Sequence, residues 1–242
     1  MTYCVGILLD EGLVMASDSR TNAGVDHVST FPKMTIFSIK DERVLVVLTS
    51  GNLAISQAVI GRLKKDIDEH TEPNLHTTQR MSDAARIVGD AVRAVHRDDA
   101  EYLRLHQADF NQSILLGGQI SGESPRLFNI YAAGNFIEAV AETPYFQIGE
   151  TKYGKPILDR VIGSGSDLNE AAKCTLISFD STLRSNLSVG LPIDLFMYSA
   201  DSFSIDCQHR VTESDPYFNH LSKAWSEGLK KTFAEIPDPD WC

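Results

Sequence analysis

The sequence predicts an α+β fold in which mainly antiparallel sheets pack face to face and helices cover their outer faces. Short apolar segments follow one another without an intervening helix, as the strands of hairpins do. Helical periodicity then interrupts this pattern, in the order strands, two helices, strands, two helices, strands, helix. With 242 residues and 43% hydrophobic content, the chain is long enough to form a single domain, 1–242, around a sizeable core.

Four short segments rich in Val, Ile and Leu open the chain. They span residues 2–9, 13–17, 34–39 and 43–49. The turn-forming stretches between them are Asp10-Glu11-Gly12, the polar stretch 19–32 that ends at Pro32, and Lys40-Asp41-Glu42. Because short apolar runs bounded by turn residues are typical of hairpins, we predict that these segments form two hairpins of one sheet.

Two helices are expected next. The hydrophobic period changes after Ser50-Gly51-Asn52, and apolar residues then recur on one helical face over 53–63, with Asn52 as the N-cap. A second helical pattern runs from about residue 82 to residue 106, with Ser82-Asp83 as the expected cap.

The second half of the chain repeats this alternation. Strands are expected over residues 112–119, 126–131, 135–140, 144–149, 193–199 and 203–211. Helices are expected over residues 152–162, 167–184 and 216–234. The second of these helices opens with Asp167-x-x-Glu170, the pattern of a capping box.

Charge and composition disfavour several classes of function. The chain has 22 basic and 33 acidic residues, a formal net charge of −11, which disfavours nucleic acid and anionic membranes as partners because both require a positive patch. The seven histidines and four cysteines show no metal-binding spacing, so neither a metal nor another cofactor is predicted. No signal peptide or membrane-spanning stretch is recognisable, and the scattered cysteines fit the reducing cytoplasm.

The first residues carry the strongest chemical signal. Thr2 follows Met1 directly and begins an apolar strand segment. Removal of Met1, which is common before a small residue, would leave Thr2 with a free α-amino group of pKa ~7.7–8.0. Such an amine can take the proton from the hydroxyl of its own threonine, so one residue supplies both nucleophile and base. The alternative is an ordinary β-forming residue on a strand.

Three further residues are candidates for supporting that nucleophile. If the first two strands form a hairpin, Asp18 lies beside Thr2, and Lys33 reaches the same end if the loop before it returns there. Lys33, held by Asp18, would stabilise the deprotonated hydroxyl. Gly51 precedes a helix, where its amide can donate to an oxyanion. The alternatives are an Asp18 that pairs with Arg20, a Lys33 that faces solvent, and a Gly51 that only makes a turn.

The chain also resembles a known family of enzymes. The resemblance rests on the segments TYCVGILLDEGLVMASDSR, FPKMTIF and VLVVLTSGN, and on the later YFQIGETKYGKPILDR and GLPIDLFMYSADSF. They resemble the N-terminal threonine peptidases of proteasome β subunits and bacterial HslV, and most of all the bacterial group Anbu (ancestral β subunit). Thr2, Asp18, Lys33 and Gly51 each fall where motif residues of that family stand.

The resemblance implies a fold, an activity and an assembly. The fold would be the four-layer αββα sandwich of the N-terminal nucleophile (Ntn) hydrolases. The activity would be that of a threonine-type peptidase, acting on peptides or unfolded proteins through an acyl-enzyme on Thr2. Relatives form rings or open spirals, so a homo-oligomer is expected, with helices 53–65 and 82–106 as suitable contact surfaces. The unfoldase partner is left unspecified.

Three features depart from the family pattern. Lys33 lies one residue closer to Thr2 than in most relatives. Glu150, in IGETKYG, replaces the serine of a Gly-Ser-Gly that contacts the threonine amine. Ser185-Asn186-Leu187-Ser188 stands where the family has Asp-x-x-Ser, so the aspartate is lost and Ser188 is kept. Glu150 and Ser188 are therefore candidate supporting residues.

These departures leave two other functions open. One is a self-assembling scaffold or binding module with the same fold and little or no hydrolytic activity. The other is an amidase that acts on a small molecule, as other families of this fold do. For Glu150 itself, the alternative to a contact with the threonine amine is a place in a surface loop.

Overall fold

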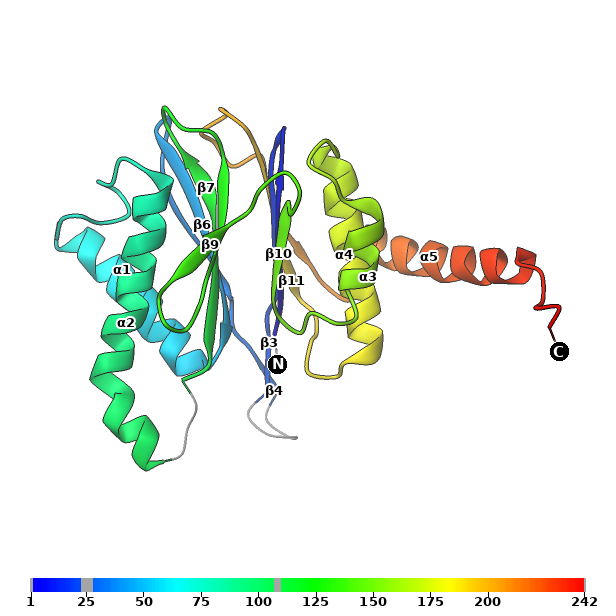
Figure 1. Ribbon diagram of the computed structural model, residues 1–242, viewed down its shortest axis with the longest axis horizontal. Coiled ribbons are helices and arrows are strands. Elements are labelled where there is room, and N and C mark those ends of the chain that lie inside the picture. Colours follow the sequence, from blue (N-terminus) through cyan, green and yellow to red (C-terminus); the bar gives the residue numbers. More distant parts are fainter. Residues whose placement is uncertain (1, 23–27, 107–109, 242) are drawn as a thin grey trace.

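Two five-stranded antiparallel sheets lie face to face between two layers of helices in this computed structural model, which describes residues 2–22, 28–106 and 110–241 (Figure 1). Because successive side chains of a strand point to opposite faces, each sheet buries one set between the sheets and the other beneath its helices. This arrangement is the four-layer αββα sandwich that the resemblance implied.

The first sheet places the N-terminal strand in its interior, in the order β10-β1-β2-β11-β12. Its strands are β1 (Tyr3–Leu9), β2 (Gly12–Asp18), β10 (Tyr145–Gly149), β11 (Ile193–Ser199) and β12 (Cys207–Val211). Strands β1 and β2 are buried almost throughout, as their near-continuous apolar runs indicate for strands covered on both faces. The start of β1 is therefore enclosed by neighbouring strands on both sides.

The second sheet has the order β5-β6-β7-β8-β9. Its strands are β5 (Met34–Ile39), β6 (Arg43–Gly51), β7 (Gln112–Ile120), β8 (Arg126–Ile130) and β9 (Phe136–Glu138). The hairpins β1–β2 and β5–β6 thus belong to different sheets, and the prediction that they share one sheet is wrong. Strand β2 takes β11 as its second neighbour instead, a pairing between segments far apart in the sequence.

Two short strands were missed in the polar stretch 19–32. Strands β3 (Arg20–Asn22) and β4 (Val28–Thr30) pair with each other as a separate two-stranded sheet. Segments of three residues are too short to show an alternating pattern. The start of β12 was also predicted four residues early, because Phe203 has a φ of 45°, which is incompatible with an extended strand.

The helices form the two outer layers (Figure 1). Helices α1 (Leu53–Asp68) and α2 (Met81–Leu105) cover the second sheet, whereas α3 (Lys155–Val161), α4 (Leu168–Ser185) and α5 (Pro216–Glu235) lie on the side of the first. Two predicted caps are confirmed. The side chain of Asn52 accepts from Ala54 N at 3.0 Å, and that of Asp167 accepts from Glu170 N at 2.7 Å.

The predicted cap of α2 is wrong. This helix begins at Met81, so Ser82 and Asp83 lie inside its first turn. The backbone N–H of Met81 donates instead to Glu123 Oε2 at 2.6 Å. Glu123 lies in the turn between β7 and β8, and a cap supplied from so far along the chain leaves no local sequence signal.

Helix α5 extends away from the sandwich (Figure 1). It buries Phe218 and Leu221 near its start. The same apolar stripe continues through Leu229 and Phe233, which are exposed. The described helices include none that combines the length and the apolar content needed to cross a bilayer.

Candidate active site

Four strand ends meet at one end of the sandwich. Thr2 directly precedes β1, and Asp18 ends the adjacent strand β2. Lys33 precedes β5 on the facing sheet, and Gly51 ends the adjacent strand β6. Thr2, Lys33 and Gly51 line one cavity of about 560 Å³. The structure thus brings together the four residues that the sequence analysis selected as nucleophile, acid, cation and oxyanion donor.

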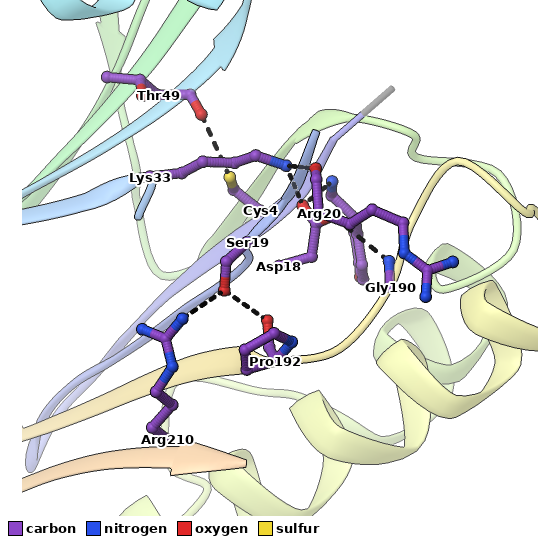
Figure 2. A network of polar contacts seen from close by, with 10 residues as sticks. Cys4, Asp18, Ser19, Arg20, Lys33, Thr49, Gly190, Pro192 and Arg210 are labelled. Carbon is purple, nitrogen blue, oxygen red and sulfur yellow. Dashed lines mark hydrogen bonds and ion pairs between the residues drawn. The ribbon is translucent and has the colours of Figure 1, made fainter. Parts of the chain in front are cut away.

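Lys33 and Asp18 form a buried ion pair that bridges the two sheets. The Lys33 Nζ lies 2.7 Å from Asp18 Oδ1 and 2.6 Å from the backbone carbonyl of Arg20. The two side chains are 6% and 0% exposed. Figure 2 shows the lysine reaching from the segment just before β5 towards this carboxylate. The alternative in which Lys33 faces solvent is therefore wrong.

The carboxylate of Asp18 is held from several sides. Besides Lys33, it accepts hydrogen bonds from Tyr3 N at 3.0 Å and from Gly190 N at 3.4 Å. Burial raises the pKa of Asp18 above its ordinary value, and the Lys33 ammonium opposes that rise by stabilising the charged form. Because Tyr3 directly follows Thr2, its bond to Asp18 fixes the start of β1 against the ion pair.

Arg20 contributes to the site in a way that the sequence analysis missed. Its backbone carbonyl accepts from Lys33, and its guanidinium donates to the carbonyl of Leu187 at 3.2 Å. The suggested alternative, in which Arg20 pairs with Asp18, is not what the structure has. The position of Arg20 in "SDSR", close to Asp18, was the one sign in the sequence that it could belong to the site. The type of a side chain does not predict that the backbone carbonyl of the same residue will accept a hydrogen bond from Lys33.

The turn after β10 fixes the backbone of Thr2. The carbonyl of Thr2 accepts from Glu150 N at 2.6 Å, and Thr2 is only 8% exposed. Gly149 has a φ of 83°, and a Cβ there would lie 2.0 Å from the Thr2 carbonyl oxygen. Only glycine allows the two backbones to approach so closely. The expected removal of Met1 concerns residue 1, which lies outside the described residues.

Gly51 lies at the junction of a strand and a helix. It has a φ of 119°, and it is followed by the N-cap Asn52 and the first turn of α1. A Cβ on Gly51 would meet the carbonyl oxygen of Asn111 at 2.0 Å. The N-terminus of a helix carries partial positive charge, so this end of the cavity favours a developing negative charge.

Glu150 and Ser188 belong to a polar network beside Thr2. Glu150 is 6% exposed, and its Oε2 accepts from Asn186 Nδ2 at 2.9 Å. The Oδ1 of Asn186 in turn accepts from Ser188 N at 2.9 Å. Glu150 is therefore buried and does not lie in a surface loop. Ser188 takes part through its backbone amide. Asn186 joins Ser188 to Glu150, although the sequence showed it only as part of the stretch in which the family's aspartate is missing.

Comparison with known proteins assigns the chain to a family. The family model described as "Proteasome subunit" matches residues 2–191. The chain belongs to the proteasome subunit family. A comparison with curated protein sequences returned no match.

Among solved structures, this proteasome-family chain is similar to several Anbu proteins. Anbu (ancestral beta-subunit) from Yersinia bercovieri is 51% identical with a TM-score of 0.94, and the match covers 99% of each chain. The Anbu (Gly-1) mutant from Hyphomicrobium sp. strain MC1 is 50% identical with a TM-score of 0.93, over 99% of this chain and 100% of that one. The Anbu chain in the helical assembly of the Anbu complex from Pseudomonas aeruginosa is 46% identical with a TM-score of 0.94, over 99% and 98%.

Cys4 lies close to the site of this proteasome-family chain without facing its cavity. The thiol is fully buried between the sheets and donates to the carbonyl of Thr49 at 3.7 Å. Burial raises the pKa of the Cys4 thiol well above its ordinary value, so the reactive thiolate is disfavoured. Cys4 is therefore a core residue.

Proposed function

We propose that the chain is a threonine-type peptidase that cleaves peptide bonds through an acyl-enzyme on Thr2 after Met1 is removed. The observation that carries this proposal is the buried Lys33 ammonium, held by Asp18 and by the Arg20 carbonyl beside the cavity that Thr2 lines. A buried cation at this point stabilises an alkoxide on the threonine. No surface role requires a lysine to be buried in this way.

The proposed reaction begins with proton transfer from the Thr2 hydroxyl to the α-amine of the same residue. The Oγ attacks the peptide carbonyl carbon, and the carbonyl electrons move onto its oxygen, which the Gly51 N–H stabilises. When this tetrahedral intermediate collapses, the departing amine takes the proton from the α-ammonium. An ester on Oγ remains, and water hydrolyses it with the amine again acting as base.

The proposal is tested by replacing the nucleophile. In the Thr2→Ala variant, we expect a fluorescent peptide vinyl sulfone to give no covalent adduct, because no hydroxyl remains beside the amine. The Thr21→Ala variant is the matched control, since Thr21 lines the same cavity and is expected to leave labelling of Thr2 intact. Intact mass and peptide mapping identify the labelled residue. Undiminished labelling of Thr2→Ala would refute the assignment.

Because the network of Glu150 and Asn186 departs from the family pattern, a second candidate function is a scaffold of the same fold with little hydrolytic activity. A third candidate is an amidase for a small molecule. Cleavage of short fluorogenic peptides by the wild-type protein supports the peptidase. Turnover of small amides alone supports the amidase, and covalent labelling with no turnover of either class supports the scaffold.

We also propose that the chain forms a homo-oligomer, in the cytoplasm. The helical assembly of the similar Anbu complex from Pseudomonas aeruginosa supports an oligomer, and the free thiols of Cys4 and Cys174 suit a reducing compartment. Helices α1 and α2 turn most of their apolar side chains towards the sheet, so α5 is the better contact surface. Five of the fifteen exposed large apolar side chains in the described residues lie between Tyr217 and Trp241.

Assembly through α5 can be tested by introducing one charged residue into its exposed apolar stripe. We expect Phe233→Asp to lower the mass found by light scattering at a given protein concentration, because it places a carboxylate in the exposed apolar stripe. Lys231→Asp is the matched control, because it adds a carboxylate to the polar face of the same helix. Equal masses for Phe233→Asp and wild type would contradict a contact through this stripe.

A further inference from the structure

Glu150 carries a buried carboxylate whose hydrogen-bond donors among the described residues are neutral. Its Oε1 accepts from Lys152 N and its Oε2 from Asn186 Nδ2, each at 2.9 Å. In the described part of the chain, no lysine, arginine or histidine nitrogen lies within ion-pair distance of it, and Lys33 and Lys155 pair with other carboxylates. An ionised carboxylate is costly to bury without a cation. The pocket around Glu150 is thus short of one positive charge.

The position of Glu150 indicates where that charge comes from. The last pair of the β1–β10 ladder joins Tyr3 to Gly149, so the next pair along the two segments is Thr2 and Glu150. The bond from Glu150 N to the Thr2 carbonyl, at 2.6 Å, confirms that the two residues remain side by side. Residues directly opposed in an antiparallel ladder have Cβ atoms about 4.5–5.5 Å apart. A cation on the backbone nitrogen of Thr2 would lie close to this carboxylate.

We propose that Glu150 is the counter-ion of the α-amino group that Thr2 gains when Met1 is removed, and that Asn186 is the positioning residue that holds this carboxylate. The inference rests on the proposed function only in taking Thr2 as the first residue of the mature chain. It assigns Glu150 an electrostatic role, which a serine at this position could not perform.

The charges around the amine determine its titration. Strand β2 presents Asp18, the start of β5 presents Lys33, and the turn after β10 presents Glu150, while Cys4 on β1 is an uncharged thiol. Loop 186–190 and the first turn of α1 contribute no titratable side chain. Two further cations belong to these segments, but Lys152 is exposed and the half-buried Arg20 guanidinium donates to the carbonyl of Leu187. Lys33 and Asp18 neutralise each other, so the unbalanced buried charge beside the amine is negative. The pKa of the amine is then raised above the ordinary ~7.7–8.0.

A raised amine pKa has a direct consequence for the chemistry. Only the neutral amine can accept the proton of the Thr2 hydroxyl, and at neutral pH the ammonium form dominates. Reaction at Thr2 therefore increases with pH through an alkaline limb. The Glu150 carboxylate orients the amine, but it also makes the reactivity of the Thr2 hydroxyl depend on pH.

Asn186 couples this carboxylate to the catalytic ion pair. Its amide donates to Glu150, and its carbonyl oxygen accepts from Ser188 N in the loop after α4. The same loop continues to Gly190, whose N–H donates to Asp18. One loop thus contacts both carboxylates that face Thr2, and the Arg20 guanidinium holds it through the Leu187 carbonyl.

The test measures the amine directly. Protein that begins at Thr2, obtained by cleaving an N-terminal fusion, is acylated over a range of pH, and the modified N-terminal peptide is quantified by mass spectrometry. We expect Glu150→Gln to lower the pKa of the amine by at least about one pH unit. The rate of labelling by a peptide vinyl sulfone rises with pH, and the midpoint of this rise is expected to move to lower pH by the same amount.

Two further variants separate charge from position. Asn186→Ala keeps the carboxylate, so the amine should titrate near the wild-type value while the rate of vinyl sulfone labelling decreases. Glu142→Gln removes the same charge from an exposed residue before β10, and it should change neither quantity.

The outcomes distinguish this inference from the proposed function. If the pKa of the wild-type amine is at or below ~7.7–8.0, the role of Glu150 as counter-ion is refuted, even if Glu150→Gln does not fold. An unchanged pKa in a folded Glu150→Gln variant refutes it as well. A raised amine pKa that falls in Glu150→Gln supports the counter-ion whether or not the wild-type protein reacts with the vinyl sulfone. Absence of that reaction counts against the peptidase alone.

Discussion

Replacing Lys33 with methionine is expected to slow covalent labelling of Thr2 by about 10²- to 10³-fold or more, by removing the cation that stabilises the alkoxide. It also leaves Asp18, which is fully buried, without its partner. The loss of one member of a buried pair lowers the free energy of unfolding by about 3–5 kcal/mol. Labelling rates and urea unfolding measure the two effects separately.

A matched lysine and a double variant complete this experiment. Lys155 is exposed and pairs with Asp159 at the surface, so Lys155→Met should reduce stability by no more than about 1 kcal/mol and leave labelling unchanged. The double variant Lys33→Met with Asp18→Asn removes the orphaned charge and should recover much of the stability, but not the reactivity. If Lys33→Met is labelled at the wild-type rate, the ion pair has no role in the chemistry.

Gly51→Ala is expected to have the second large effect. A Cβ at Gly51 would lie 2.0 Å from the Asn111 carbonyl oxygen, on a backbone with a φ of 119° that other residues rarely adopt. The strand end must shift, and with it the N–H proposed to stabilise the oxyanion. We expect labelling of Thr2 to slow by about 10²- to 10³-fold, the range for loss of one such donor.

Gly61 supplies the control for that substitution. It lies within α1, and a Cβ there meets nothing within 4 Å. Gly61→Ala should therefore raise the free energy of unfolding by about 0.5–1 kcal/mol, through its greater helix propensity, and leave labelling unchanged. Equal labelling of Gly51→Ala and Gly61→Ala would show that the strand end at Gly51 does not take part in the reaction.

Local signals in the sequence account for the elements that were predicted well. The apolar runs of β1, β2, β5 and β6 and the caps Asn52 and Asp167 depend on residues close in the chain. The assignment of hairpins to sheets depends on long-range pairing, here of β2 with β11, which periodicity does not encode. The cap of α2 by Glu123 failed to be predicted for the same reason.

The candidate site divides in a similar way. Thr2, Asp18, Lys33 and Gly51 could be selected because each stands at a strand end and has a side chain or conformation with an obvious chemical use. The Arg20 carbonyl could not, since a backbone acceptor has no residue-type signal. Asn186 could be noted only as a departure, because its contact with Glu150 joins segments that are distant in sequence.

The most direct test of the central claim uses a peptide epoxyketone. Its ketone and epoxide carbons are adjacent, so it closes a ring only with a hydroxyl and a free amine on neighbouring carbons: the hydroxyl adds to the ketone and the amine opens the epoxide. We predict that the wild-type protein lacks Met1 by intact mass and forms this ring on Thr2. Retention of Met1, or an adduct on any other residue, would contradict a nucleophile that is activated by its own amine.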